Sequence, residues 1–164
     1  FQALASRSGC KCAPAVWLMP GTLSPMLWSV GRTTLVVFPE ALISRLAPDS
    51  RETLLAHELA HFQRGDHWVR LLSLLVTGLF WWHPITWLAR CMIESAEEEC
   101  CDAWVVTRAA AAPRQYAEAI LETVDFIAER RTSVPPFGTG LGQLPFLRQR
   151  LIWIMRGPRR QELG

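Results

Sequence analysis

The chain has 164 residues, of which 50% are apolar, with eight Trp and a formal net charge of +2 at pH 7. This length suits one domain, and the apolar content excludes a disordered or low-complexity chain. The net charge is small and no run of five Lys or Arg residues occurs, so we expect no nucleic-acid partner.

Residues 1–46 are interrupted by Pro and Gly, which excludes long helices there. Two β-prone runs, 16–19 and 33–38, predict short strands of a small sheet. The sequence begins at Phe1 without a recognisable signal peptide, which predicts a fragment of a longer protein.

Helical patterns follow. Asp49 and Glu52 have the spacing of a capping box, and apolar residues at helical spacing come next: Leu55, Leu59 and Phe62. We expect this helix to stop near Gly65 and Asp66 to cap a second helix that starts at His67.

Residues 71–89 are 19 consecutive residues without a formal charge, which is nominally long enough to span a membrane. Pro84 lies inside this run and disfavours helical geometry at His83, so we expect two helices that meet there. The second helix would begin at Pro84 and continue towards residue 112. The run is therefore predicted to be a helical turnaround, buried or dipping against a bilayer, with a Trp-rich corner at its boundary: Trp81, Trp82 and Trp87.

The remaining sequence predicts an amphipathic helix over 114–131, a Gly/Pro loop over 135–142 and a short helix over 146–155. A basic tail follows with Arg156, Arg159 and Arg160, for which a solvated tail and a membrane-surface role are both open.

The string His57-Glu58-Leu59-Ala60-His61 predicts a zinc site. Four helical steps of about 100° bring His57 and His61 to nearly the same face, where both imidazoles can reach one Zn²⁺. Glu58 lies beside them and can act as the general base that accepts a proton from the attacking water.

A catalytic zinc site needs a third protein ligand, and two residues compete for this role. His67 lies six residues after His61, as in the metzincin pattern. That pattern needs Gly at position 64, where this chain has Arg64 and places its glycine one residue later.

The other candidate is Glu98. Glu98 and Asp102 are four residues apart and share a helix face, an arrangement that suits a ligand carboxylate and a second carboxylate that accepts the N–H of a ligating His. Apolar neighbours indicate that part of this helix is buried: Ala96, Cys100, Cys101, Ala103 and Trp104. A solvated acidic face is the alternative, and we favour Glu98 as the ligand.

Five clustered cysteines do not suggest a disulfide framework, which favours a reducing compartment. Cys100 and Cys101 are expected to pack as small apolar residues, while a structural zinc held with Cys10 and Cys12 stays an alternative.

These motifs together resemble the metallopeptidase domain of BlaR/MecR-type signal transducers. The resemblance covers most of residues 14–130 and rests on the 57–61 string with Asp66, on Trp81-Trp82-His83-Pro84, on Glu98-Glu99-Cys100-Cys101-Asp102-Ala103-Trp104, and on the stretch 28–41. It implies a gluzincin-like zinc peptidase in which Glu58 is the base, His57, His61 and Glu98 are the ligands, and Asp102 is the supporting carboxylate. It also implies a membrane-embedded parent whose peptidase faces the cytoplasm and cleaves a repressor or itself.

We therefore expect a mostly helical α+β fold of the zincin-like, gluzincin type, binding one Zn²⁺. A single metallopeptidase domain would comprise a β-rich part (1–46), a helical catalytic core (47–131) and a C-terminal loop and helix (132–164). Two interpretations of strand 33–38 are open: it is a core strand, or it borders the cleft, where a substrate chain could add to its edge.

The predicted function is zinc-dependent hydrolysis of a peptide bond in a protein or peptide substrate, with membrane association through the parent chain. The alternatives are a non-catalytic, zinc-stabilised membrane-associated signalling module and a plain transmembrane linker. No oxyanion-stabilising residue is apparent from the sequence. Tyr116 and His83 are candidates, and each also has a purely structural interpretation.

Overall fold

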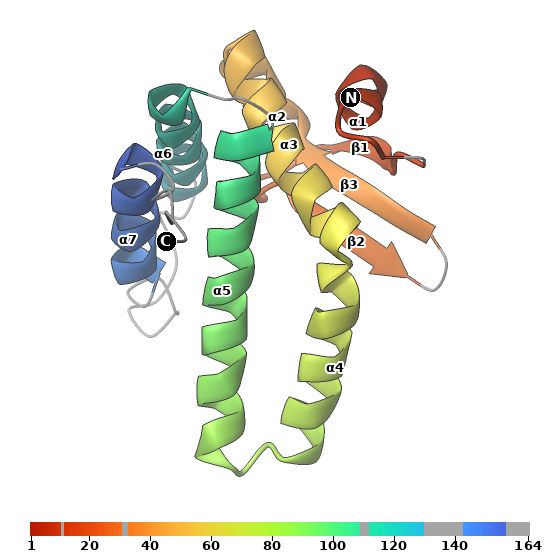
Figure 1. Ribbon diagram of the computed structural model, residues 1–164, viewed down its shortest axis with the longest axis vertical. Coiled ribbons are helices and arrows are strands. Elements are labelled where there is room, and N and C mark those ends of the chain that lie inside the picture. The colour runs from red at the N-terminus through yellow and green to blue at the C-terminus, as the bar shows by residue number, and fades with distance from the viewer. Residues whose placement is uncertain (11, 31–32, 109–111, 130–142, 157–164) are drawn as a thin grey trace, which may run out of the picture.

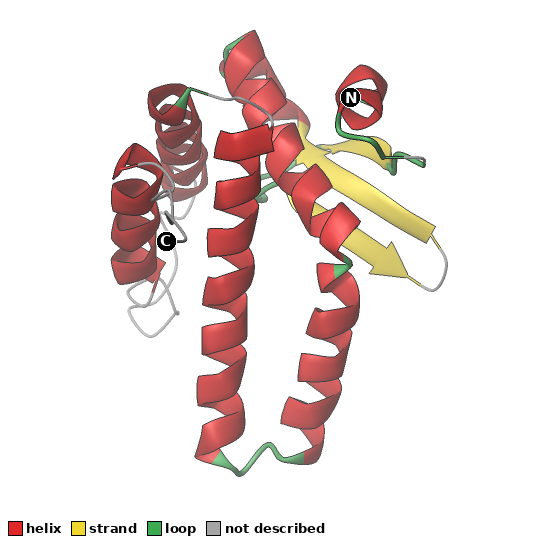
Figure 2. Ribbon diagram, viewed as in Figure 1, coloured by secondary structure: helices red, strands yellow, loops and turns green. Residues whose placement is uncertain are grey.

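The computed structural model describes residues 1–10, 12–30, 33–108, 112–129 and 143–156. Helices dominate and accompany one small sheet (Figure 2). A mostly helical chain with a small N-terminal sheet is what the sequence predicts. The predicted loop at 135–142 and the residues Arg159 and Arg160 lie outside the described part of the chain.

The sheet contains β1 (Ala15–Met19), β2 (Met26–Val30) and β3 (Thr33–Pro39) in the order β1-β3-β2. Strand β3 pairs in parallel with β1 and antiparallel with β2. The two predicted strands are confirmed, whereas β2 was not predicted. The expectation that strand 33–38 has an edge for a substrate is wrong, because β1 and β2 occupy both of its sides.

Helix α3 (Pro48–Arg64) runs past the sheet and carries both histidines of the predicted zinc site. The capping box expected at Asp49 and Glu52 is wrong. The N-cap is Ala47, without a side-chain cap, and the helix begins at Pro48, whose fixed φ suits the first helical position. Gly65 ends the helix in the left-handed conformation, with φ 73°, as the sequence predicts.

Helices α4 (Asp66–Leu79) and α5 (Pro84–Arg108) form a hairpin that projects away from the sheet (Figure 1). The predicted break at Pro84 is confirmed. Asp66 does not cap α4 as expected, because Gly65 is the N-cap and the Asp66 carboxylate contacts His61 and Arg64 instead.

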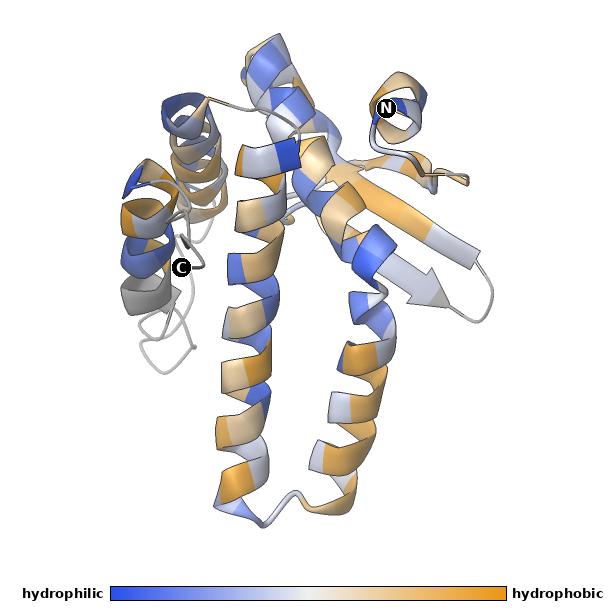
Figure 3. Cartoon of the chain, in the orientation of Figure 1, coloured by the Kyte–Doolittle hydropathy of each residue, from blue (hydrophilic) through white to orange (hydrophobic). Residues whose placement is uncertain are grey.

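The outer half of this hairpin is apolar and exposed (Figure 3). Its large apolar side chains are therefore not buried within the described chain, although Thr77 is. Of the two possibilities predicted for residues 71–89, burial does not apply to these side chains. None of the described helices combines the length and apolar character needed to cross a bilayer.

Helix α6 (Pro113–Glu129) packs against α3, and α7 (Gln143–Arg156) packs against both α6 and α5. Two short helices, α1 (Gln2–Arg7) and α2 (Glu40–Arg45), flank the sheet in the chain. One core cluster joins α1, α3, α5, α6 and α7 around Leu59 and Tyr116, and a second packs β3 and α2 against α3 and α6 around Phe38. Both clusters include buried residues of α3, so this helix is fixed against the sheet and against the other helices.

The left-handed conformation between α3 and α4 can be tested by replacing glycine with alanine at two positions. Gly65→Ala should lower the free energy of unfolding by about 1 kcal/mol, because an L side chain is strained in the left-handed region. The added Cβ would meet only Trp68 Cδ1, at an ordinary 3.8 Å, so the cost is conformational.

Gly78→Ala is the control, since Gly78 lies inside α4 and an added Cβ meets nothing within 4 Å. It should stabilise the protein by about 0.5–1 kcal/mol. Urea unfolding measures both values, and equal effects of the two substitutions would contradict the assignment of Gly65 as the left-handed joint.

Candidate metal centre

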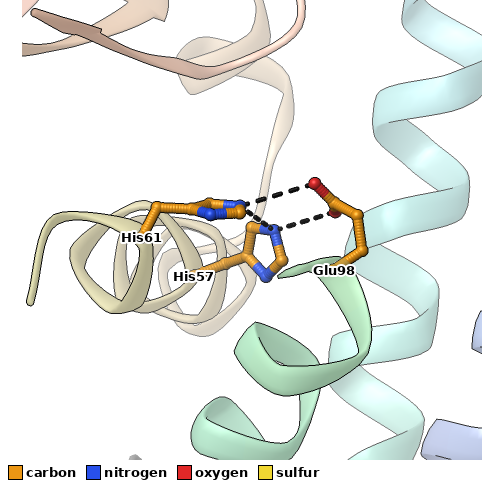
Figure 4. Close-up of side chains that lie close together, drawn as sticks. All are labelled: His57, His61 and Glu98. Atoms are coloured by element: carbon orange, nitrogen blue, oxygen red, sulfur yellow. Dashed lines mark hydrogen bonds and ion pairs between the residues drawn. The ribbon is translucent and has the colours of Figure 1, made fainter. Parts of the chain in front are cut away.

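Two imidazoles and one carboxylate converge between α3 and α5 (Figure 4). His57 and His61 project from consecutive turns of α3, and Glu98 projects from α5 towards them. The two Nε2 atoms are 3.2 Å apart. Glu98 Oε2 lies 3.3 Å from His57 Nε2, and Oε1 lies 3.5 Å from His61 Nε2. The structure thus brings together the three residues that the sequence assigns as ligands.

The hydrogen bonds of Nδ1 in each histidine show which ring nitrogen is free to bind a metal. His61 Nδ1 lies 2.8 Å from Asp66 Oδ2, and a carboxylate only accepts, so Nδ1–H donates. Tyr116 donates its hydroxyl proton to Asp102 Oδ1 at 2.6 Å, so its oxygen accepts from His57 Nδ1–H at 2.8 Å. In its neutral form, each ring therefore carries its lone pair on Nε2, the nitrogen that faces the Glu98 carboxylate.

This donor set fits a zinc ion. Zinc–nitrogen bonds of 2.0–2.1 Å in a tetrahedron place neighbouring ligand atoms about 3.3 Å apart, close to the distances between the three side chains. Two imidazole nitrogens and a carboxylate are also a known ligand set of catalytic zinc. Lone pairs and a carboxylate at this spacing repel one another unless a positive charge lies among them.

The electrostatics of the site agree with that requirement. Burial opposes ionisation of Glu98, but the adjacent imidazoles of His57 and His61 and the charge of Arg150 hold its pKa far below the usual range. Burial likewise opposes a charge on His61, but Cys101 and Glu98 outweigh it and raise the pKa of His61 to about 11. The surroundings thus favour a cation at the point where the three side chains meet.

Glu58 is buried next to this cluster, with a relative exposure of 6%. Burial raises its pKa, while the neighbouring imidazoles of His57 and His61 oppose the increase. No described residue forms a hydrogen bond with its carboxylate, which therefore stays available to accept a proton from a bound molecule.

Asp102 is fully buried one turn beyond Glu98 on α5. Its Oδ1 is 3.5 Å from His57 Nδ1, and the Tyr116 hydroxyl links the two groups by shorter contacts. Burial, followed by the charge of Asp102, raises the pKa of Tyr116 well above its ordinary value, so the phenol keeps its proton. Tyr116 therefore orients His57, a role that the sequence did not predict for this tyrosine.

The other sequence candidates lie outside the cluster. His67 is not among the residues that converge on His57 and His61 in the described chain. His83 lies at the hairpin turn, on the residue before α5, whereas Glu98 is 14 residues into this helix, or about 20 Å away. Neither cysteine pair forms a metal-ligand group among the described residues, and Cys10 instead donates to the carbonyl of Cys12.

Cys101 belongs to a second group of possible ligand atoms, with His61 and Asp66. Its sulfur lies 3.3 Å from His61 Nδ1 and 3.7 Å from Asp66 Oδ2. Burial raises the pKa of its thiol, and Arg64 already pairs with Asp66. We therefore interpret this group as the surroundings that orient His61, and not as a separate metal site.

Two arginines at the site were missed by sequence reasoning. Arg70 on α4 pairs with the buried carboxylate of Glu97 at 2.9 Å and lies 3.5 Å from Glu98. Arg150 on α7 contacts both Glu98 and Asp102. Arg150 is 48 residues from Asp102 in the chain, and no local pattern relates the two.

The sequence is similar to a known peptidase family. A family model described as BlaR1 peptidase M56 matches residues 2–154. No curated protein and no solved structure matches the chain.

The ligand set can be tested by metal analysis of three variants. Glu98→Gln should lower zinc content, because it removes the anionic ligand, and His67→Ala should retain zinc. Glu99→Gln is the matched control, since Glu99 is the exposed neighbour on the same helix. Inductively coupled plasma mass spectrometry measures the zinc per chain. Unchanged zinc in Glu98→Gln together with loss in His67→Ala would favour a metzincin-type ligand set.

Proposed function

The chain belongs to the BlaR1 peptidase M56 family, and we propose that it is a zinc-dependent endopeptidase with a gluzincin-like site. The observation that carries the proposal is the convergence of His57, His61 and Glu98 at distances that fit tetrahedral zinc, with Glu58 buried beside them. A purely structural site would need no such carboxylate. For this reason we favour a peptidase over a non-catalytic zinc-stabilised module.

Each residue has a defined part in the proposed mechanism. His57, His61 and Glu98 hold the metal, and Asp66 and Tyr116 fix the orientation of the two rings. Zinc, when bound, supplies Lewis-acid polarisation of water and of the scissile carbonyl. Glu58 accepts the proton of the attacking water and delivers it to the leaving amine. Its raised pKa, caused by burial, makes the glutamate a stronger base than an exposed one.

The substrate is a protein or peptide, as the family implies. The outer edge of β2 replaces β3 as the strand to which an extended substrate would add, because β2 lies next to α3 and α4. A transcriptional repressor or the parent chain itself is the substrate that we propose, in a membrane protein whose catalytic part faces the cytoplasm.

Glu58→Gln should bind zinc as the unchanged protein does and lose peptide cleavage by a factor of about 10²–10⁴, because the amide cannot accept the proton. The measurement is cleavage of an unfolded protein and of the chain itself, followed by mass spectrometry. Glu52→Gln, an exposed position on the same helix, is the control and should cleave normally. Normal cleavage by Glu58→Gln would reject Glu58 as the base.

The exposed apolar hairpin supports association with a lipid bilayer. Aromatic side chains gather at its turn, where Phe80, Trp81, Trp82 and Trp87 are all exposed. Large aliphatic side chains on both helices are exposed behind them: Leu71, Leu72, Leu74, Leu75, Leu79, Ile85 and Leu88. A surface of this size and composition is costly in water, and Trp is enriched where apolar surface meets the lipid headgroups.

The depth of insertion follows from the helix rise. The uncharged ends of α4 and α5 comprise residues 71–79 and 84–89, which at about 1.5 Å per residue give roughly 9–14 Å. This is less than half of the hydrocarbon core of about 30 Å. We therefore propose that the hairpin enters one leaflet and that the metal centre stays outside it.

Vesicle binding tests this proposal. The double variant Trp81→Ser/Trp82→Ser should bind phosphatidylcholine vesicles at least tenfold more weakly in a flotation assay, because it removes aromatic area from the turn. Trp17→Ser/Trp28→Ser is the matched control, since more than half of each of these two Trp side chains is also exposed but both lie on the sheet. Equal loss of binding in both double variants would show that the hairpin is not the lipid-binding surface.

A further inference from the structure

Arg150 is the residue through which α7 reaches the metal centre. Its Nη1 lies 2.8 Å from Glu98 Oε2. Its Nε and Nη2 donate to the two oxygens of Asp102 at 2.9 and 2.8 Å. One guanidinium therefore bonds to a candidate ligand and to the carboxylate one turn further along α5.

The two neighbouring carboxylates on α5 require a positively charged partner. Glu98 and Asp102 are both anionic and lie four residues apart on one face, where like charges repel. Asp102 is fully buried and the side chain of Glu98 is only 28% exposed, so water screens this repulsion poorly. The planar fork of Arg150 satisfies both carboxylates at once, which a lysine ammonium cannot do with the same geometry.

The contacts form a closed ring. Arg150 holds Asp102, Asp102 accepts from Tyr116, and the Tyr116 oxygen accepts from His57. His57 Nε2 then faces Glu98, which returns to Arg150. His61 lies outside this ring and is oriented by Asp66. Arg150 thus acts on Glu98 directly and on His57 through two intervening groups.

We infer that Arg150 is a positioning residue of the metal centre, which fixes Glu98 and His57 in the geometry that binds zinc. The packing of α7 supports this role. Ile154 is fully buried in the core cluster that contains Tyr116, and Leu147 and Leu151 pack against the same cluster, so the backbone that carries Arg150 is anchored on both sides. The inference rests on the proposed zinc site and not on peptide hydrolysis.

The test is the zinc affinity of purified protein, measured by competition with a chromophoric chelator. Arg150→Gln should weaken zinc binding by about 10–100-fold, the range typical of lost groups that support metal ligands. Arg150→Lys keeps the charge and should recover part of the loss. Arg148→Gln is the matched control, because Arg148 is an exposed residue of the same helix, and it should bind zinc as the unchanged protein does.

Thermal unfolding of the metal-free proteins separates positioning from folding. A folded Arg150→Lys protein with weaker zinc binding and an altered Co²⁺ absorption spectrum supports the inference, even where Arg150→Gln fails to fold. Unchanged zinc affinity in a folded Arg150→Gln or Arg150→Lys protein would overturn it. Failure of the unchanged protein to bind zinc would instead reject the proposed function, so the two failures are distinguishable.

Discussion

The repulsion among two imidazole lone pairs and a carboxylate is the constraint on which the rest of the structure depends. His57, His61 and Glu98 bring these groups within 3.2–3.5 Å of one another. Such an arrangement is favourable only around a positive charge. The fold must therefore hold the three side chains together, and a bound cation, as proposed, would supply the charge that this arrangement needs.

The protein meets this constraint with partners that differ for each ligand. His61 is oriented by the carboxylate of Asp66, which lies just past the end of the same helix. His57 is oriented by the neutral hydroxyl of Tyr116. This hydroxyl links the His57 ring to the buried carboxylate of Asp102. Because a buried charge is costly without a partner, Asp102 is in turn paired with an arginine. Asp66, Glu98 and Asp102 thus each have a specific donor, whereas Glu58 has none among the described residues.

Sequence reasoning succeeded where the determinants are local. Two histidines four residues apart must share a helix face, and the Gly65 stop and the Pro84 break follow from backbone geometry. It failed at two helix starts, because α3 begins at Pro48 after Ala47 and the N-cap of α4 is Gly65. It also failed where the determinants are distant or weak. Strand β2 lies between Pro25 and Gly31, and its pairing with β3 is visible only in the folded sheet. Arg150 and the role of Tyr116 depend on how α6 and α7 pack against α5, which no spacing in the chain encodes.

The continuity of α5 has a mechanical consequence. This helix runs without a break from the hairpin turn at Pro84 past Glu98 and Asp102, whereas α4 joins α3 through Gly65, four residues after His61. A displacement of the turn would therefore be transmitted along the continuous helix α5, whereas α4 can change its direction relative to α3 at Gly65. Tilting the hairpin must then shift the carboxylate against the two imidazoles. In a zinc-bound centre, whose ligand distances lie within about 0.2 Å of their usual values, such a shift would change the positions of the three ligands relative to one another.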